Sequence, residues 1–272
     1  MNIDFALLQR KLKGMIGTFH GFCENNNIRY FIASGTLLGA IRHRDFIPWD
    51  DDIDIYMLRD DYDMLVDELW RKLPEPLELR CFKNFPKIPT HYAKLIDKST
   101  TLIENKFSKY VEGVYIDVFP LDAIDPNSLL DKIKWKCSRF LNSVLLSKYQ
   151  TTKKKGIIKE LARVISRYVS ARFLHAQIEK MITARNKTET TFVGDYLGAY
   201  NTKEIFPKYY FEECAQLQFG SLYLWGTQFA DEYLTQLYGN YMELPPPDER
   251  VPKHDLLLID FFNSYKDYKY PI

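Results

Sequence analysis

Four aspartates fall within five residues of this chain, and large apolar residues enclose them. They are Asp50, Asp51, Asp52 and Asp54, in the stretch "GTLLGAIRHRDFIPWDDDIDI" that ends at Ile55. Acidic side chains normally stay in water, because burying an unpaired charge costs much free energy. Any fold of this chain must therefore hold several carboxylates in a partly buried place and give them a partner.

The residues around the acids predict a strand, a turn, a helix and a second strand. Residues 28–35 read as a short apolar strand, and residues 36–43 read as a helix with Ser34 or Thr36 as its cap. The segment "DIDIYM", residues 52–57, alternates acidic and apolar side chains. That alternation is typical of a strand with two different faces.

Two carboxylates on one face of a strand repel each other unless a cation lies between them. Because side chains two apart on a strand share a face, we expect Asp52 and Asp54 to point the same way. Asp50 lies just before them, and Asp51 is expected to face the other way in a structural role. Mg²⁺ is the expected ion, with Mn²⁺ as the alternative, since hard cations bind carboxylates, water and phosphates. Asp117, in the apolar segment "VYIDVFP", is the candidate third acid of a site for displacement at phosphorus.

The acids also allow two other interpretations. A calcium-binding loop would need Gly and Glu where this chain has Ile55 and Asp61, so that interpretation largely fails. A solvated acidic turn is the general alternative, and the alternating isoleucines weigh against it.

Phosphate-binding groups are expected beside the acids. Gly35 ends the first strand and opens the helix, where free backbone N–H groups and the helix dipole favour a phosphate. Arg42 and His43 lie at the other end of this short helix, and Arg42 could bind a phosphate with two parallel hydrogen bonds. A salt bridge from Arg42 to Asp50 or Asp51 is the alternative.

Two later residues are further candidates for the same site. Lys94 in "HYAKLID" lies on a predicted strand and could bind a phosphate, or it could be an edge residue that keeps its amine in water. His254 in "RVPKHD" could close over the site, or the tail could simply pack on the core.

The remaining pattern predicts a mixed α/β (α+β) fold, a sheet flanked by helices. Helical spacing runs over roughly 2–25 and closes at "NNN". The other expected elements are a helix at 59–73, short strands in "LELRCFK", "HYAKLID", "TTLIE" and "VYIDVFP", basic helices from 127 to 185 broken near "YQTTKKKG", a hairpin around "LQFGSLYLWG" and a helix in "TQFADEYLTQLYG". We assign 1–126 and 188–272 to the catalytic core, and 127–187 to a basic helical insertion.

Charge is distributed unevenly along the 272 residues. Residues 131–187 carry 15 Lys or Arg and 3 Asp or Glu, whereas the remainder carries 22 basic and 33 acidic residues. Basic amphipathic helices indicate contact with an anionic membrane surface or acceptor. An ordinary solvated face is the alternative. The chain has no nucleic-acid recognition signature beyond this charge, so no nucleic-acid partner is predicted.

The cysteines and the apolar runs bear on location. The four cysteines are widely separated and lack zinc-site spacing, which favours reduced and mostly buried thiols in the cytoplasm. No signal peptide is expected, and no apolar run approaches the roughly 18 residues needed to span a bilayer. A cytoplasmic protein, with peripheral contact at the inner face of the membrane, is predicted.

Several segments together resemble the LicD family of phosphocholine transferases, within the nucleotidyltransferase fold. The resemblance begins at Gly35 with the acidic stretch and continues through "HYAKLIDKSTTLIE", "GVYIDVFPLDAI", "FPKYYF", "YLTQLYGNYMELPP" and "RVPKHD". It covers most of the chain apart from the basic helices. Fukutin-type enzymes, which transfer ribitol phosphate, belong to the same broader group. One departure is the turn Ser34-Gly35-Thr36, where the wider fold usually has Gly-Gly or Gly-Ser. Thr36 is expected to supply the side-chain hydroxyl that the serine supplies there.

The resemblance implies transfer of phosphocholine, or a similar phospho-alcohol, from a CDP-activated donor to a sugar hydroxyl, with release of CMP. Teichoic acid, lipopolysaccharide or capsule, attached to lipid, would be the acceptor. Asp52, Asp54 and Asp117 would hold the metal, Asp50 would ligate it or support a ligand, and Asp117 or Asp50 would take the proton from the acceptor.

Two rival functions remain open at this point. A nucleotidyltransferase would use the same metal site to move a nucleoside monophosphate from a nucleoside triphosphate to a small molecule. A non-catalytic glycan-binding protein could share the fold, although it would have no use for three costly carboxylates. The abundance of Tyr, Phe and Trp does not identify the head group among choline, ethanolamine, glycerol and ribitol.

Overall fold

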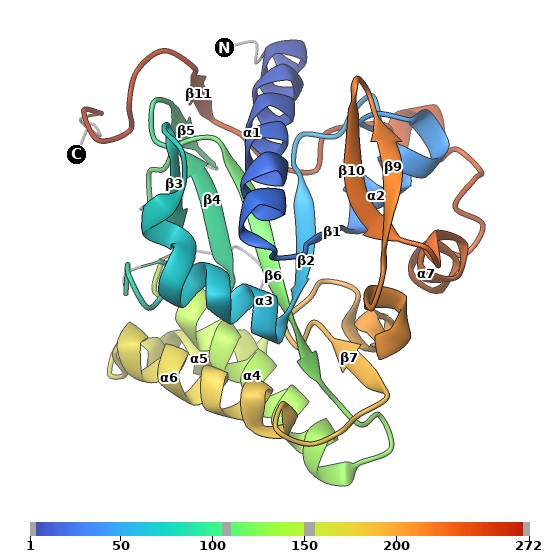
Figure 1. Cartoon of the computed structure of the whole chain (residues 1–272). Coiled ribbons are helices and arrows are strands. Elements are labelled where there is room, and N and C mark those ends of the chain that lie inside the picture. Colours follow the sequence, from blue (N-terminus) through green and yellow to red (C-terminus); the bar gives the residue numbers. More distant parts are fainter. Residues whose placement is uncertain (1–3, 87, 105–109, 150–155, 269–272) are drawn as a thin grey trace.

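A seven-stranded sheet lies at the centre of the computed structural model, which describes residues 4–86, 88–104, 110–149 and 156–268 (Figure 1). Five strands follow one another in the order β1 (Phe31–Ile32), β2 (Asp54–Leu58), β6 (Tyr115–Ala123), β4 (Ala93–Asp97) and β3 (Leu77–Arg80). The far end of β6 pairs with β7 (Phe192–Gly194), which in turn pairs with β8 (Ile205–Pro207). The β2–β6 pair is parallel and the other pairs are antiparallel. The fold is therefore mixed α/β, as the sequence predicts.

Strand β6 is the central element, because nearly every side chain along it is buried on one face or the other. Its apolar residues, among them Ile116 and Val118, belong to the main hydrophobic core. Buried strands with neighbours on both sides read as near-continuous apolar runs. Two aspartates, Asp117 and Asp122, interrupt this run. Asp117 lies beside Lys94, and Asp122 pairs with Arg59.

Helix α1 (Phe5–Asn26) packs its apolar face against β6 and β10. Asp4 caps its start by accepting the N–H of Leu7, and Asn27 ends it in the left-handed conformation. The predicted helix over 2–25 is confirmed from residue 5 onward; residues 2 and 3 lie outside the described part of the chain.

Smaller elements complete the core. They are α2 (Ser34–His43), α3 (Arg59–Asp63), which continues as a π-helical turn (Met64–Leu69) and a 3₁₀ turn (Trp70–Lys72), α7 (Ala230–Tyr238), the hairpin β9 (Cys214–Phe219) and β10 (Leu222–Thr227), the pair β5 (Thr101–Ile103) and β11 (Leu258–Asp260), and 3₁₀ turns at Asn201–Glu204, Lys208–Phe211 and Pro247–Glu249. In Figure 1 the hairpin stands on the far side of α1 from β3.

The basic insertion forms α4 (Leu129–Leu146), α5 (Ile157–Ser166) and α6 (Ala171–Ile182), followed by a 3₁₀ turn (Thr183–Arg185). These helices gather at the lower end of the sheet in Figure 1 and share a second hydrophobic cluster, which includes Val144, Leu174 and Ile178. The predicted break at "YQTTKKKG" lies mostly outside the described residues. No helix of the described chain is both long and apolar enough to cross a membrane.

Two local expectations are corrected. The predicted strand over 28–35 is only two residues long, and helix α2 begins at Ser34, with Ala33 at its cap position and no side-chain cap. The second strand begins at Asp54 and not at Asp52. Asp52 therefore lies in the preceding loop, and the alternation of a strand does not fix its direction.

Candidate active site

The predicted carboxylates converge on one cavity. Asp54 and Asp117 are direct Cα partners across the parallel pair β2 and β6, and Asp50 and Asp52 approach from the loop before β2. All four side chains line a cavity of about 370 Å³. Because strands β2 and β6 are adjacent, residues 63 positions apart in sequence share one site.

Crowding and burial make these acids hard to ionise. Burial raises the pKa of Asp50 to about 8, and the charge of Asp52 adds to that effect. Burial also raises the pKa of Asp117 to about 7, although the Lys94 ammonium opposes it. The pKa of Asp54 is raised by burial and then by Asp52 and Asp117. A bound cation would favour the charged forms of all these groups.

Two of these carboxylates have buried oxygens without a hydrogen bond. They are Oδ2 of Asp50 and Oδ1 of Asp117, on residues that are 7% and 8% exposed. Buried polar atoms in folded proteins are normally paired, so each such atom calls for a partner. Oxygen ligands on several acids are the donor set that Mg²⁺ prefers, and the site therefore fits a divalent cation.

Asp51 is not among the residues that line the cavity, and its partner is His254 on the C-terminal tail. Its Oδ1 lies 2.8 Å from Nδ1 of His254, and its Oδ2 accepts the His254 backbone N–H. The same ring nitrogen is 3.9 Å from Oδ2 of Asp52. The hydrogen bond to Asp51 raises the pKa of His254 to about 9. In the part of the chain that is described, these three residues also have potential ligand atoms within 4.8 Å of one another.

The turn before the acids is shaped by close contact. A Cβ on Gly35 would lie 2.8 Å from Oδ2 of Asp50, so glycine leaves the space in which that carboxylate sits. Ser34 has a positive φ of 46°, and its N–H donates to the hydroxyl of Tyr233. Thr36 is buried, and its Oγ1 accepts the backbone N–H of Asp54. The turn thus fixes the start of β2, with Ser34 and Gly35 lining the cavity.

Arg42 borders a second cavity of about 470 Å³ that also touches Gly35, Asp50 and Lys253. Its Nη1 donates to the backbone carbonyls of Tyr241 and Glu243 and not to Asp50 or Asp51. The two cavities share those three residues and therefore adjoin at the carboxylates.

His43 is placed beside Arg42 and not beside the acids. Its Nε2 accepts from Nε of Arg42 at 2.9 Å, and its ring packs edge-on against Trp49. Burial lowers its pKa.

Lys94 is a fully buried residue of β4, not an edge residue. Its amine pairs with Oε1 of Glu112 at 2.8 Å, lies over the ring of Tyr115, and is 3.8 Å from Oδ1 of Asp117. These contacts hold a positive charge directly behind the third carboxylate.

Sequence reasoning missed several polar residues of the cavity, among them Asp195, Glu204 and Asn142. Asp195 and Glu204 lie in the connection after β7, and Asn142 comes from α4 of the basic insertion. Oδ1 of Asn142 is buried without a hydrogen bond. None of these three belongs to a local pattern, so only the tertiary structure, which brings α4 and the connection after β7 to the cavity, could have indicated them.

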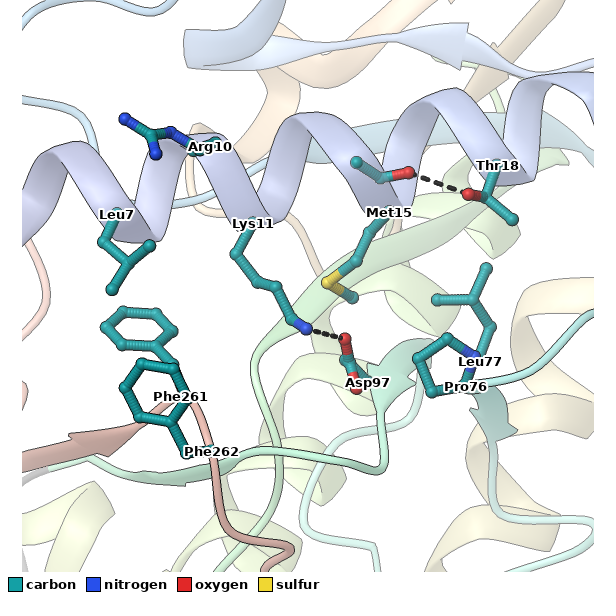
Figure 2. Close-up of a pocket in the computed structure, with 11 residues that line it drawn as sticks. Leu7, Arg10, Lys11, Met15, Thr18, Pro76, Leu77, Asp97, Phe261 and Phe262 are labelled. Atoms are coloured by element: carbon teal, nitrogen blue, oxygen red, sulfur yellow. Dashed lines mark hydrogen bonds and ion pairs between the residues drawn. The ribbon is translucent and has the colours of Figure 1, made fainter.

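A separate hollow of about 390 Å³ lies between α1 and the C-terminal tail (Figure 2). Apolar residues such as Leu7, Phe261 and Phe262 line much of it, and Lys11 and Asp97 form an ion pair at 2.7 Å within it. Because this ion pair is already satisfied, the hollow does not offer the free oxygens that the acid-lined cavity offers.

A pair of acid-bearing strands preceded by a Gly turn and a short helix defines a nucleotidyltransferase-type site. The family model described as "LicD/FKTN/FKRP, nucleotidyltransferase domain" matches residues 27–144. The chain is also 32% identical over 248 residues to the lipopolysaccharide cholinephosphotransferase LicD of Haemophilus influenzae, covering 87% of this chain and 90% of that protein. The chain therefore belongs to the LicD family.

A shorter similarity extends to animal proteins. Human ribitol 5-phosphate transferase FKRP is 46% identical over 41 residues, which is 15% of this chain and 8% of that protein. An uncharacterized protein of Rickettsia prowazekii is 55% identical over 42 residues, or 15% of this chain and 16% of its own length.

Proposed function

We propose that this protein transfers phosphocholine from CDP-choline to a sugar hydroxyl of lipopolysaccharide or a related lipid-linked glycan, such as teichoic acid or capsule, and releases CMP. The observation that carries the proposal is the pairing of Asp54 with Asp117 in a cavity where buried oxygens of Asp50 and Asp117 lack a hydrogen bond. Similarity to a cholinephosphotransferase along most of the chain supports the choice of donor.

Asp52, Asp54 and Asp117 would hold Mg²⁺, with Mn²⁺ as a substitute and Asp50 as a further ligand or support. The ion would neutralise charge on the diphosphate of the donor. His254, hydrogen-bonded to Asp51, would border the same group of acids.

The chain's own residues would orient the donor and move one proton. Gly35 and Lys253 border both cavities, so the diphosphate would lie where the cavities meet. The acceptor oxygen forms a bond to the phosphorus that carries choline, and the bond from that phosphorus to the CMP oxygen breaks. Asp117 or Asp50 takes the acceptor's proton. Reactions of this kind depend mainly on positioning and charge stabilisation.

A direct assay tests the proposal. The purified protein is incubated with Mg²⁺, CDP-choline and a truncated lipopolysaccharide. The released CMP is quantified, and the mass of the glycan is measured by mass spectrometry. We expect CMP release and a phosphocholine mass increment in equal amounts, both abolished by EDTA and restored by Mg²⁺. CDP-ethanolamine, CDP-glycerol and CDP-ribitol run in parallel would identify a different head group.

The same assay separates the rival functions. Pyrophosphate release from a nucleoside triphosphate, with no reaction of any CDP-alcohol, would replace the proposal with nucleotidyl transfer. Glycan binding without Mg²⁺ or nucleotide binding would indicate a non-catalytic protein.

We further propose that α5 contacts an anionic membrane at the cytoplasmic face. Its exposed apolar residues are Ile157, Ile158, Leu161 and Val164, followed by exposed Tyr168. They recur at spacings of about one helical turn, while exposed Lys159, Arg163 and Arg167 occupy another side of the helix. This combination is typical of helices that lie in the membrane interface.

Vesicle flotation tests the membrane contact independently of catalysis. We expect flotation with vesicles containing phosphatidylglycerol, and its loss with phosphatidylcholine alone or after Leu161→Glu. Glu160→Gln, a change on the same helix that removes no apolar contact, should float at least as well as the unmodified chain. Absence of flotation with both vesicle types would remove this part of the proposal.

A further inference from the structure

Two parallel rows of side chains cross the neighbouring strands at the cavity. The first row is polar, with Asp54 on β2, Asp117 on β6 and Lys94 on β4 as neighbours in register. Two residues further along the same strands, Tyr56 and Phe119 are register partners. Side chains two apart on a strand share a face, so the aromatic pair lies on the same face as the carboxylates, about 7 Å further along.

Tyr92, one residue before β4, completes the second row. Its ring centroid is 4.3 Å from that of Phe119, and the ring of Phe119 is 6.1 Å from that of Tyr56. All three residues line the cavity, together with Tyr200. Tyr92, Phe119 and Tyr200 are only partly buried, so their rings remain accessible from the cavity.

Two further acids stand at this aromatic end. Glu204 is 3% exposed and Asp195 is 7% exposed, and both line the cavity. The hydrogen bonds of Glu204 come from neutral donors, the hydroxyl of Tyr56 and the backbone N–H of Tyr200. Asp195 accepts the backbone N–H of Leu197.

No cation within 4 Å of either acid is found in the described residues. Arg139 is a cation whose charge acts on both acids, but its guanidinium donates to the carbonyls of Tyr196 and Gly198. Gly198 leaves room for Glu204, since a Cβ there would lie 1.9 Å from Oε2 of Glu204. Both buried acids therefore lack a cation at ion-pair distance. Burial raises the pKa of each, and the more distant charge of Arg139 opposes that rise only in part.

Aromatic faces and an uncompensated carboxylate are the groups that recognise an organic cation. A quaternary ammonium group cannot donate hydrogen bonds, and it is bound by ring faces and by charge. A polyol head group would instead need several hydrogen-bonding partners around it. Oδ1 of Asn142 is a buried oxygen of this cavity without a hydrogen bond, and it adds a partial negative charge of the same sign.

We propose that this aromatic end is the subsite for the trimethylammonium head group of the donor, formed by Tyr56, Tyr92, Phe119, Asp195, Tyr200 and Glu204. This subsite rests on the proposed function. It assigns the selection of the head group to residues other than the metal-binding acids. The phosphate would lie at the first row and the ammonium at the second. The nucleotide would extend into the adjoining cavity beside Trp49 and Arg42.

A neutral isostere of the donor gives the sharpest test. In CDP-3,3-dimethylbutanol a carbon replaces the choline nitrogen, so the size is kept and the charge is lost. Dissociation constants of this compound and of CDP-choline are measured by calorimetry with the full chain and Mg²⁺. We expect CDP-choline to bind at least tenfold more tightly.

Variants then show which residues distinguish CDP-choline from the neutral compound. Phe119→Leu and Glu204→Gln should each reduce the tenfold ratio to about threefold or less while changing the affinity for the neutral compound little. Tyr223→Leu, an exposed aromatic of the hairpin β9–β10, is the matched control and should keep the full ratio. If a variant does not fold, the ratio of the two dissociation constants measured with the unmodified chain still tests the proposed subsite.

The two proposals fail in different ways. Equal binding of CDP-choline and its neutral isostere by the unmodified chain would overturn the subsite and leave the CDP-alcohol donor intact. A ratio that stays at tenfold or more in both Phe119→Leu and Glu204→Gln would also overturn the subsite. Binding of neither compound would remove the proposed function and the subsite together.

Discussion

Asp54 and Asp117 are direct partners across the only parallel strand pair in the described sheet, and both carboxylates face the same cavity. The sheet brings them together at the cost of placing like charges side by side in a buried position. A chain would gain stability by removing such a pair, so the pair is best explained by what it binds.

The first prediction concerns these two acids. Asp54→Asn and Asp117→Asn should each lower turnover by about 100-fold or more, since charge stabilisation of the transferring phosphoryl group is lost. The melting temperature should stay the same or rise, because repulsion is relieved. Enzyme assays and thermal melts measure both, and Asp60→Asn, an exposed acid on α3, is the control. Near-normal turnover in both variants would rule out this metal site.

The second prediction is a pH dependence of stability. The pKa values of Asp50 and Asp117 are raised from 3.8 to about 8 and about 7. Between pH 3.8 and these values the folded protein holds protons that the unfolded chain has lost. Stability without metal should therefore fall as the pH rises through this window.

Mg²⁺ should reverse that trend, since it competes with protons for the same oxygens. Thermal melts with and without Mg²⁺ should show a larger increase in melting temperature at pH 8 than at pH 6. An increase of the same size at both pH values would show that the ion binds elsewhere.

The third prediction concerns Gly35. A methyl group there would lie 2.8 Å from Oδ2 of Asp50 and would push that carboxylate aside. Alanine itself suits helix α2, so the free energy of unfolding should change by less than about 1 kcal/mol. Turnover should fall by about tenfold. Gly21→Ala on α1, where a Cβ meets nothing within 4 Å, should leave turnover unchanged.

The fourth prediction is a coupling between Asp51 and His254, whose side chains are hydrogen-bonded at 2.8 Å across 203 residues. A double-mutant cycle of Asp51→Asn and His254→Gln, read from the free energy of unfolding, should give an interaction of about 1–3 kcal/mol. Additive effects would show that the tail does not dock on the acidic loop.

The fifth prediction concerns the buried ion pair that joins helix α3 to strand β6. Arg59 donates two hydrogen bonds to Asp122, at 2.7 and 2.6 Å, and both residues are buried. Asp122→Asn leaves the guanidinium without its main countercharge and should cost about 3–5 kcal/mol in denaturant unfolding. Asp63→Asn removes a more exposed partner of the same arginine and should cost less than about 1 kcal/mol. Similar losses in the two variants would contradict this account.

Much of the fold was predictable because its patterns are local. The apolar spacing of α1, the hairpin β9–β10 and the strand β6 with Asp117 all follow from the backbone geometry of helices and strands. Prediction failed where local pattern and structure diverge by a few residues. The acidic alternation suggests a strand from Asp52, but pairing with β6 begins only at Asp54.

The sequence by itself determined that a cluster of aspartates must be partly buried beside a Gly turn, and that Asp117 lies on an apolar strand. Only the tertiary structure decided which other groups meet them. His254 reaches Asp51, Lys94 pairs with Glu112, and Glu204 joins Asp195 at the aromatic end of the cavity. The physical reason is that periodicity fixes the direction of a side chain within its own element. Contacts between distant elements are selected by how their apolar faces pack together.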